Sequence, residues 1–328
     1  MDCDVLVVGG GAAGCTMSYR LSKAGMNVAL VTSGTPATAM SCGRIKVTEE
    51  NKELRQFIRQ AGEKYGLFTG EREAQAYTNK GTLYSQSFLS DYDDSSQARA
   101  AAGIEGNKDF NPDLAARITG KLTPYWIRQA NLDETAESLK EIPEEMIILP
   151  PLFDIRHYRS SMKKLEEQSG RKLREAVTPL SLPGKRLHEC LIQAAKAAGT
   201  RVLEGRKVTD ITAQSALIQS GIREQEMTYG ALVLAGGNLI SGGLVLDGNM
   251  VREPLLGINV TEVTPTRLRS AELTEALSSG ICAHGCRAAA GVYACGSIVA
   301  GMSYPLNKGL WDVMLNAWNA AEKVRDAL

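Results

Sequence analysis

Residues 3–14 decide the fold, and they read CDVLVVGGGAAG. The apolar run Val5–Val8 leads into a glycine turn of the form G-x-G-x-x-G, and a helical pattern then extends from Ala12 to Ala24. A second apolar run, Val28–Val31, follows Gly25. A strand, a glycine turn, a helix and another strand within about 30 residues are typical of a βαβ unit with parallel strands.

The glycine turn has the pattern of a dinucleotide-binding turn. Gly9 makes the tight turn, Gly11 lets the backbone approach a pyrophosphate, and Gly14 lets the helix pack on the strand. The helix N-terminus, where Ala12 and Ala13 lie, supplies free N–H groups and a partial positive charge for a phosphate. We therefore expect these five residues to bind a nucleotide cofactor, with a structural turn in an unrelated α/β protein as the alternative.

The end of the second strand lacks the acidic residue that usually holds the ribose of the nucleotide. Thr32 stands at this position, and Ser33 follows it. A hydroxyl can hydrogen-bond a ribose, but it lacks the charge that makes such a bond strong. We expect FAD to contact Thr32 and Ser33, and the missing acid leaves room for FMN, which has no adenosine half.

Two later segments favour a flavin over a nicotinamide cofactor. Residues 229–237 read YGALVLAGG and residues 291–297 read GVYACGS, and they resemble the two strand-plus-glycine elements of two-dinucleotide-binding flavoproteins. A serine replaces the aspartate that is usual at the end of the second element. Plain buried strands with a glycine cap are the alternative. The expected flavin contacts here are Ala235, Gly236, Gly296 and Ser297.

The last amphipathic stretch, Gly309–Ala327, predicts a C-terminal helix. Its N-terminus, at Lys308 and Gly309, is expected to face the N1–O2 edge of the flavin. Positive charge at that edge would stabilise the reduced, anionic flavin.

Composition excludes several classes of protein. The chain has 328 residues, with 37 Lys plus Arg against 37 Asp plus Glu, so its formal net charge is zero and gives no reason to expect a nucleic-acid binder. No apolar run approaches the ~18 residues of a membrane span. The N-terminus has no basic region typical of a signal peptide. The seven cysteines then indicate reduced thiols and a cytoplasmic protein.

The order of the patterns predicts an α/β protein, with a Rossmann-like flavin domain of the two-dinucleotide-binding type and an inserted cap domain. We assign residues 1–48, 180–242 and 280–328 to the flavin domain, and 49–179 with 243–279 to the cap or substrate domain. Strand signals in the cap are weak apart from Met146–Leu149, and its plausible helices are Glu50–Tyr65 and Asn111–Thr119. The later elements expected are a helix at His188–Ala198 and strands at Arg201–Leu203, Lys207–Thr212, Ser215–Gln219, Glu226–Tyr229 and Ala231–Ala235.

Several short motifs together resemble the B subunit of anaerobic glycerol-3-phosphate dehydrogenase. Residues 241–245 (SGGLV) and 252–260 (REPLLGINV) look like its SGGL…REP-hydrophobic-LG signature. Residues 31–34 (VTSG) through 41–43 (SCG) are similar to a stretch of that family that also lacks the ribose acid, residues 79–83 (NKGTL) resemble its P-x-G-T loop, and residues 294–297 (ACGS) match its A-x-G-S. The resemblance is good at both ends and at 230–260, and loose in the middle.

The resemblance implies a flavoprotein related to the fumarate reductase flavoprotein group. Members of the family pair with a catalytic A subunit, and with an iron–sulfur C subunit that docks on the membrane. The complex oxidises glycerol 3-phosphate to dihydroxyacetone phosphate and reduces a quinone. The resemblance further implies a flavin-contact loop at Ser41, Cys42 and Gly43. The middle domain looks shorter than in the family and the segment 280–291 is compressed, so the exact substrate stays open.

Three residues are candidates for catalysis on a small anionic substrate. Arg252 suits bidentate binding of a phosphate or carboxylate, or else it pairs with Glu253 to brace a loop. His284 could move a proton beside the flavin, and Arg287 could bind an anion, although a plain surface loop is the alternative for both. No metal site is predicted, because Cys282 and Cys286 lack a second close pair of ligands.

Three functions therefore stay open. The first is a flavin-dependent dehydrogenase that takes a hydride from a small phosphorylated or carboxylated alcohol. The second is a non-catalytic flavin subunit that relays electrons and helps assembly while a partner oxidises the substrate, which the shortage of histidines favours. The third is a fumarate-reductase-like enzyme. We expect a cytoplasmic protein, with a peripheral position on the inner membrane face through a partner subunit as the alternative.

Overall fold

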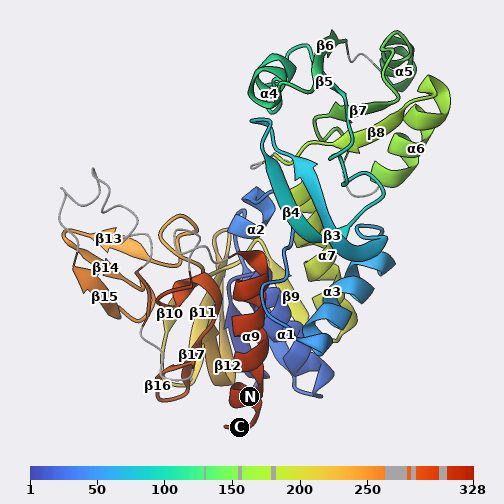
Figure 1. Cartoon of the computed structure of the whole chain (residues 1–328). Helices are drawn as coiled ribbons and strands as arrows, with labels where there is room; N and C mark the ends of the chain where they lie inside the picture. The colour runs from blue at the N-terminus through green and yellow to red at the C-terminus, as the bar shows by residue number, and fades with distance from the viewer. Residues whose placement is uncertain (129–130, 154–156, 179–181, 263–278, 282–285, 303–308) are drawn as a thin grey trace. The chain divides into compact units, whose positions relative to one another are not determined.

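The computed structural model describes the chain apart from residues 129–130, 154–156, 179–181, 263–278, 282–285 and 303–308 (Figure 1). Its contacts divide the chain into two compact units. Unit 1 comprises Met1–Thr38, Thr48–Leu54 and Leu191–Leu328, and unit 2 comprises Ala39–Val47 and Arg55–Cys190. Unit 2 is thus inserted in the sequence of unit 1. The domain borders expected from the sequence stay a prediction, and each unit is described by itself.

A parallel sheet forms the centre of unit 1. Strand β1 (Cys3–Val8) lies between β2 (Val28–Thr32) and β12 (Arg223–Leu234), and β9 (Arg201–Glu204) pairs with β2. The strand β17 (Val292–Ala294) pairs in parallel with β12. Helix α1 (Ala12–Lys23) connects β1 to β2. The structure therefore confirms the predicted βαβ unit and the α/β, Rossmann-like class.

Strand β12 is longer than the sequence pattern indicates. Its first half pairs antiparallel with β11 (Ser215–Ser220), which pairs with β10 (Lys207–Ile211), and its second half pairs in parallel with β1. The expectation of two separate strands, Glu226–Tyr229 and Ala231–Ala235, was wrong. Gly230 does not make a turn between them: a Cβ at this position would lie 2.9 Å from the carbonyl oxygen of Asp4, so the glycine permits close approach to β1.

Helix α9 (Leu310–Arg325) packs against α1, as the red and blue helices of Figure 1 show. The rings of Tyr19 and Trp318 stack with centroids 6.4 Å apart. The guanidinium of Arg20 lies 4.7 Å from the Trp318 ring centroid and pairs with Glu322 at 2.5 Å. The two ends of the described chain thus pack against each other within unit 1.

A small antiparallel sheet precedes the last strand of unit 1. It consists of β13 (Val245–Asp247), β14 (Met250–Arg252) and β15 (Asn259–Glu262). Val251 is fully buried in the same hydrophobic cluster as Leu234 and Ile298. The strand β16 (Arg287–Ala289) pairs with β17, and a short 3-10 helix, Gly296–Ile298, follows β17.

Unit 2 has a four-stranded parallel sheet of order β6-β5-β7-β8. Its strands are Ala100–Ile104 (β5), Thr123–Ile127 (β6), Met146–Leu149 (β7) and Lys172–Glu175 (β8). Alternate residues of β5 face opposite layers: Ala100 and Ala102 join a cluster with helices α5 (Leu132–Lys140) and α6 (Tyr158–Ser169), and Ala101 joins one with α4 (Pro112–Thr119). The strand at Met146–Leu149 was predicted correctly. The sequence pattern indicated few other strands in this region, but β5, β6 and β8 are strands of the same sheet.

A hairpin of β3 (Gly70–Tyr77) and β4 (Leu83–Leu89) completes the strands of unit 2. Three more helices lie at or near the borders between the units in the sequence: α2 (Ala37–Met40), α3 (Lys52–Lys64) and α7 (Leu182–Ala197). Helix α7 begins six residues before the predicted start at His188. Pro183 lies in its first turn, where proline is tolerated.

Candidate functional site

The chain's own packing requires three of the glycines at the end of β1. Gly9 has a φ of +115°, and a Cβ there would lie 2.4 Å from the carbonyl oxygen of Ala235. A Cβ at Gly14 would lie 1.8 Å from the carbonyl oxygen of Gly9, and one at Gly10 would lie 2.4 Å from Thr32 Oγ1. These glycines let β1, β12 and α1 come together at the carboxyl end of the sheet.

Gly11 is different, because packing does not require it. A Cβ on Gly11 would meet nothing nearer than Thr38 Oγ1 at 3.4 Å and Pro36 Cβ at 3.8 Å. Gly11 is the N-cap of α1, its φ is −73°, and the first turn of the helix holds no acidic residue. The amide of Ala12 donates to Thr38 Oγ1 at 2.7 Å. The missing side chain thus keeps open an approach to a helix N-terminus, which is where a pyrophosphate binds in a dinucleotide fold.

The side chain of Thr32 lies beside the same turn. Its side chain is buried against Gly10, whereas the next residue, Ser33, is exposed. Thr32 therefore lies beside the glycine turn, at the end of β2, where the sequence placed it. Its contact with a ribose stays a prediction.

The two later glycine elements meet the turn at the ends of β12 and β17. The amide of Ala235 donates to the carbonyl of Val8 at 2.8 Å, and that of Cys295 donates to Leu234 at 3.0 Å. A Cβ at Gly296, whose φ is +76°, would lie 2.4 Å from the Cβ of Ala13. The amide of Gly296 donates to Asn316 Oδ1 of α9 at 2.8 Å. Three glycine segments far apart in the sequence therefore converge at one edge of the sheet.

Gly236 and Ser297 lie at this edge as well. A Cβ at Gly236 would be 3.0 Å from the Cα of Gly243, so the backbones of the two glycines approach closely. A Cβ at Gly237 would be 3.6 Å from Ser297 Oγ. The structure thus brings the predicted contacts of the second and third elements together in unit 1.

The N-terminus of α9 contains an acid that the sequence reasoning missed. The amide of Gly309 donates to Asp312 Oδ2 at 2.9 Å, and the Thr48 hydroxyl donates to Asp312 Oδ1 at 2.9 Å. The negative charge of this carboxylate partly neutralises the positive end of the helix dipole, which was expected to face a flavin. Lys308, the other residue predicted here, lies outside the described residues.

Arg252 and Glu253 do not pair with each other. Arg252 Nη2 pairs with Asp247 Oδ2 across the β13–β14 hairpin at 2.5 Å. Glu253 is buried, and its carboxylate accepts from the amides of Leu255 at 2.9 Å and Leu256 at 2.7 Å. Burial raises the pKa of Glu253. The bracing Arg–Glu pair considered from the sequence was therefore wrong, and Glu253 instead caps a turn.

The other two predicted catalytic residues are not brought together with Arg252 by any contact between described residues. Arg287 is exposed on β16, and its Nε donates to the carbonyl of Ala289 at 3.4 Å. His284 lies outside the described residues. The catalytic roles of the three residues stay a prediction.

The predicted flavin-contact loop belongs to unit 2. The amide of Gly43 donates to Ser41 Oγ at 3.1 Å, and Gly43, with a φ of +67°, packs on the backbone of Pro183. Cys42 is a half-buried free thiol. The next residue, Arg44, is buried and pairs through Nη1 with the buried carboxylate of Asp93.

A second buried pair lies in the same unit. Arg186 Nη1 and Nη2 contact the two carboxylate oxygens of Glu175 at 2.7 and 2.9 Å, and the Arg186 guanidinium lies 3.7 Å from the ring centroid of Tyr158. Ser90 Oγ is 2.9 Å from the Tyr158 hydroxyl. Burial raises the pKa of Tyr158, so its hydroxyl keeps its proton. Sequence patterns gave no signal for either buried pair.

Two general properties follow from the described part of the chain. It contains no group of three or more His, Cys, Asp or Glu side chains that could hold a metal ion. Within the same ranges, no helix is both long and apolar enough to cross a membrane.

Comparisons with known proteins give three kinds of similarity. The model of the family described as FAD dependent oxidoreductase matches residues 4–277. The B subunit of anaerobic glycerol-3-phosphate dehydrogenase from Pectobacterium carotovorum subsp. carotovorum (strain PC1) is 24% identical over 339 aligned residues, covering 79% of this chain and 80% of that protein. This match confirms the resemblance inferred from the motifs.

Solved structures give weaker similarity. The crystal structure of Thermovibrio ammonificans THI4 is 13% identical with a TM-score of 0.40, covering 99% of this chain and 89% of that one. The anhydrotetracycline hydroxylase OxyS of Streptomyces rimosus is 13% identical with a TM-score of 0.43, covering 99% of this chain and 63% of that one.

Proposed function

This chain belongs to the FAD dependent oxidoreductase family, and we propose that it is a flavin-dependent dehydrogenase subunit that oxidises glycerol 3-phosphate to dihydroxyacetone phosphate and passes the electrons to a quinone. The convergence of the three glycine segments at one edge of the unit 1 sheet carries the proposal of a flavin enzyme. The similarity to one chain of a glycerol-3-phosphate dehydrogenase supports the choice of substrate.

The cofactor of the family is FAD, and the residues of unit 1 fit it. The open space at Gly11 leaves room for a pyrophosphate at the N-terminus of α1, where the amide of Ala13 would hold it. The amide of Ala12 would join it by leaving Thr38 Oγ1, to which it donates at 2.7 Å. Thr32 and Ser33 would then face the ribose. The remaining proposed contacts in unit 1 are Gly9, Gly14, Ala235, Gly236, Gly296, Ser297 and Gly309. The flavin contacts expected from the sequence at Ser41, Cys42 and Gly43 stay a prediction.

Bound FAD would supply the two-electron acceptor for the oxidation. The chain's own residues would have to hold the anionic substrate and accept the proton of its hydroxyl. Arg252 and Arg287 are the proposed anion-binding residues, and His284 is the proposed base. Arg252 would have to leave Asp247, or share its guanidinium between that carboxylate and the substrate.

The name of the relative, one subunit of a dehydrogenase, supports a multi-subunit complex. We propose that the partners are the catalytic A subunit, which would share the substrate oxidation, and the iron–sulfur C subunit. The chain would be cytoplasmic and would reach the inner membrane face through a partner.

One observation favours a second candidate, an electron-relay and assembly subunit. Arg252 is paired with Asp247, and among the described residues exposed Arg287 donates only to a backbone carbonyl of its own strand. Oxidation of the substrate would then take place in the partner.

A fumarate-reductase-like reaction asks for several Arg and His side chains in one cleft, which only Arg252, His284 and Arg287 could supply.

Anaerobic mixing of the FAD-loaded protein with glycerol 3-phosphate tests the proposal. Loss of the visible flavin absorbance is expected with glycerol 3-phosphate and not with glycerol, which lacks the anion. Bleaching that requires the added catalytic partner would favour the relay. Bleaching by succinate, or flavin reoxidation by fumarate, would favour the third candidate. The matched variants are Arg252→Gln, which should slow bleaching, and Arg223→Gln, an arginine on the exposed part of β12, which should not.

A further inference from the structure

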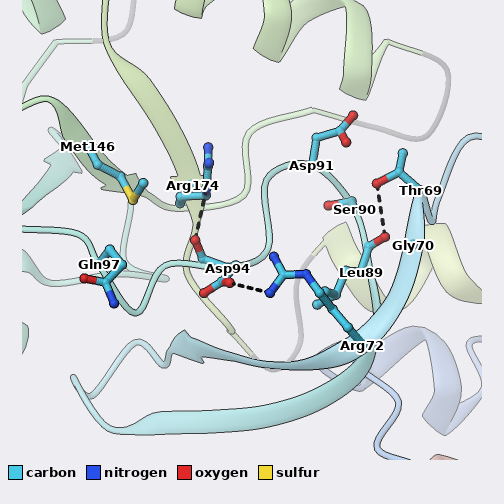
Figure 2. Close-up of a pocket in the computed structure, with 10 residues that line it drawn as sticks. All are labelled: Thr69, Gly70, Arg72, Leu89, Ser90, Asp91, Asp94, Gln97, Met146 and Arg174. Carbon is cyan, nitrogen blue, oxygen red and sulfur yellow. Dashed lines mark hydrogen bonds and ion pairs between the residues drawn. The ribbon is translucent and has the colours of Figure 1, made fainter.

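Unit 2 contains a pocket of about 400 Å³ that none of the functional residues above lines. Its polar walls come from the start of the β3–β4 hairpin, from the segment after β4, and from β8 (Figure 2). The polar and charged side chains of its lining include those of Thr69, Arg72, Ser90, Asp91, Asp94 and Arg174.

Arg174 is held in place by the backbone. Its Nε donates to the carbonyl of Asp94 at 3.0 Å, and its Nη1 donates to the carbonyl of Leu173 at 2.6 Å. Its side chain is only 18% exposed, and its nearest acid, Glu166, is 3.5 Å away. Two neutral carbonyls and the ion pair with Glu166 therefore fix the guanidinium, and none of these contacts uses the Nη2 donors.

Arg72 is tied to the same place by Asp94. Arg72 Nη1 lies 3.1 Å from Asp94 Oδ2, while the Asp94 carbonyl accepts from Arg174. Figure 2 shows the two arginines reaching Asp94 from different strands. Because Asp94 is shared in this way, the two guanidinium groups line the same pocket despite their like charge.

The acids of the pocket have partners of their own. Asp94 is paired with Arg72, and Asp91 Oδ2 accepts from Arg159 Nη2 at 2.8 Å. Arg174 Nη1 pairs with Glu166 Oε1 at 3.5 Å. The two arginines and two aspartates of the lining thus balance in charge, and what the pocket offers an anion is the Nη2 donors of Arg174, which no contact with a described residue uses, with Arg72 beside them.

The inner wall of the pocket is rigid. Ser90 is buried, its amide donates to Asp93 Oδ2 at 2.8 Å, and its hydroxyl is bonded to Tyr158. Thr69 Oγ1 donates to the carbonyl of Leu89 at 3.3 Å. A pre-formed wall of this kind lowers the cost of binding a small ligand.

We propose that this pocket is an oxyanion-binding site, in which Arg174 and Arg72 hold the phosphate or carboxylate group of a small hydroxylated ligand. The planar guanidinium suits bidentate binding of either group. Asp94 and Thr69 would accept from the hydroxyl groups of the ligand. The site goes beyond the proposed oxidation, since it lies wholly in unit 2 and no step of the reaction is assigned to it.

Calorimetric titration of the FAD-loaded protein tests the site with three probes: inorganic phosphate, glycerol 3-phosphate and glycerate. Saturable binding is expected for at least one of them, and the probe that binds tells phosphate recognition from carboxylate recognition. The variant Arg174→Gln should weaken that binding at least tenfold. The control Arg128→Gln removes an arginine that is 83% exposed on unit 2 and should bind as the parent does.

Arg72→Gln keeps the test decisive if Arg174→Gln fails to fold, because the Arg72 side chain is 63% exposed and its loss leaves no buried partner. It too should weaken binding several-fold. No saturable binding of any probe, or equal binding by parent and both folded variants, overturns the proposal. The bleaching experiment tests the proposed function separately. If glycerol 3-phosphate bleaches the flavin of Arg174→Gln with unchanged kinetics, the proposed function stands, and the calorimetric titration alone decides whether this site exists.

Discussion

Gly296 and Ala13 are in direct contact within unit 1: a Cβ on Gly296 would lie 2.4 Å from the Cβ of Ala13. The first residue follows β17 near the end of the chain, and the second lies in the first turn of α1. This contact closes the edge of the sheet at which the glycine segments meet. A side chain at position 296 would therefore push apart the two ends of the chain just where the cofactor is proposed to bind.

Gly296→Ala should destabilise the protein and lose FAD. The added methyl group overlaps Ala13 and the residue must keep its φ of +76°, so overpacking of about 1–3 kcal/mol adds to backbone strain of about 1–2 kcal/mol. Gly291→Ala is the matched control, because Gly291 has a φ of +68° and nothing lies within 4 Å of its Cβ position. Denaturant unfolding of both variants isolates the overlap, and equal losses of stability would contradict the account.

Gly11→Ala should weaken FAD binding without unfolding the protein. Its Cβ has only ordinary contacts within the chain, but it would occupy the approach to the N-terminus of α1. We expect FAD affinity to fall at least tenfold while the melting temperature of the FAD-free protein stays close to that of the parent. Fluorescence titration with FAD measures the first quantity. The control is Gly70→Ala, because nothing lies within 4 Å of that Cβ position; its FAD affinity and its melting temperature should both remain unchanged. Full FAD affinity in Gly11→Ala would show that Gly11 does not belong to the site.

Glu175→Gln should destabilise unit 2 strongly. The substitution keeps the shape of the side chain but leaves the buried guanidinium of Arg186 without its anion. Breaking a buried pair from one side costs about 3–5 kcal/mol. The control Glu105→Gln breaks an exposed pair with Arg128 and should change stability little. Chemical denaturation followed by circular dichroism compares the two, and a loss no greater than that of the control would show that the Arg186–Glu175 pair is dispensable.

Glu253 should make stability depend on pH. Burial raises its pKa in the folded chain above the ordinary value, so the folded state binds this proton more tightly than the unfolded state does. Its contribution to the free energy of unfolding is therefore complete below the ordinary glutamate value of about 4.3 and is lost as pH rises through the folded-state pKa. Relative to Glu253→Gln, which stays neutral, the parent should lose stability as pH rises from about 4 through that folded-state pKa. A parent that instead gains stability over this range would mean that the two amides of Leu255 and Leu256 outweigh burial.

The parts of the fold that the sequence predicted well are set by local patterns. The apolar run Val5–Val8, the glycine turn and the helix after it each follow from neighbours in the chain, and all three are confirmed. The strand β5 was missed because Ala100–Ile104 reads AAAGI, without the β-branched or aromatic residues that signal a strand in its first four positions. Its small side chains suit a central strand covered on both faces, which only the surrounding structure reveals.

The candidate site divides in the same way. The glycine segments can be recognised from the sequence alone. The ion-pair and hydrogen-bond partners of the charged residues, by contrast, lie far away along the chain. Thr48 and Asp312 are 264 positions apart, and Arg44 meets Asp93 only because unit 2 folds. Similarly, Arg252 was weighed against its neighbour Glu253, but strand pairing gives it Asp247. No local pattern carries this information.

The most direct test of the central claim is the amount of dihydroxyacetone phosphate formed in a single anaerobic turnover of the FAD-loaded protein with glycerol 3-phosphate. The account predicts about one dihydroxyacetone phosphate for each flavin reduced, because two electrons leave the substrate and two enter FAD. A protein that holds FAD in full yet forms no dihydroxyacetone phosphate, alone or with its partner proteins, would contradict the proposed oxidation.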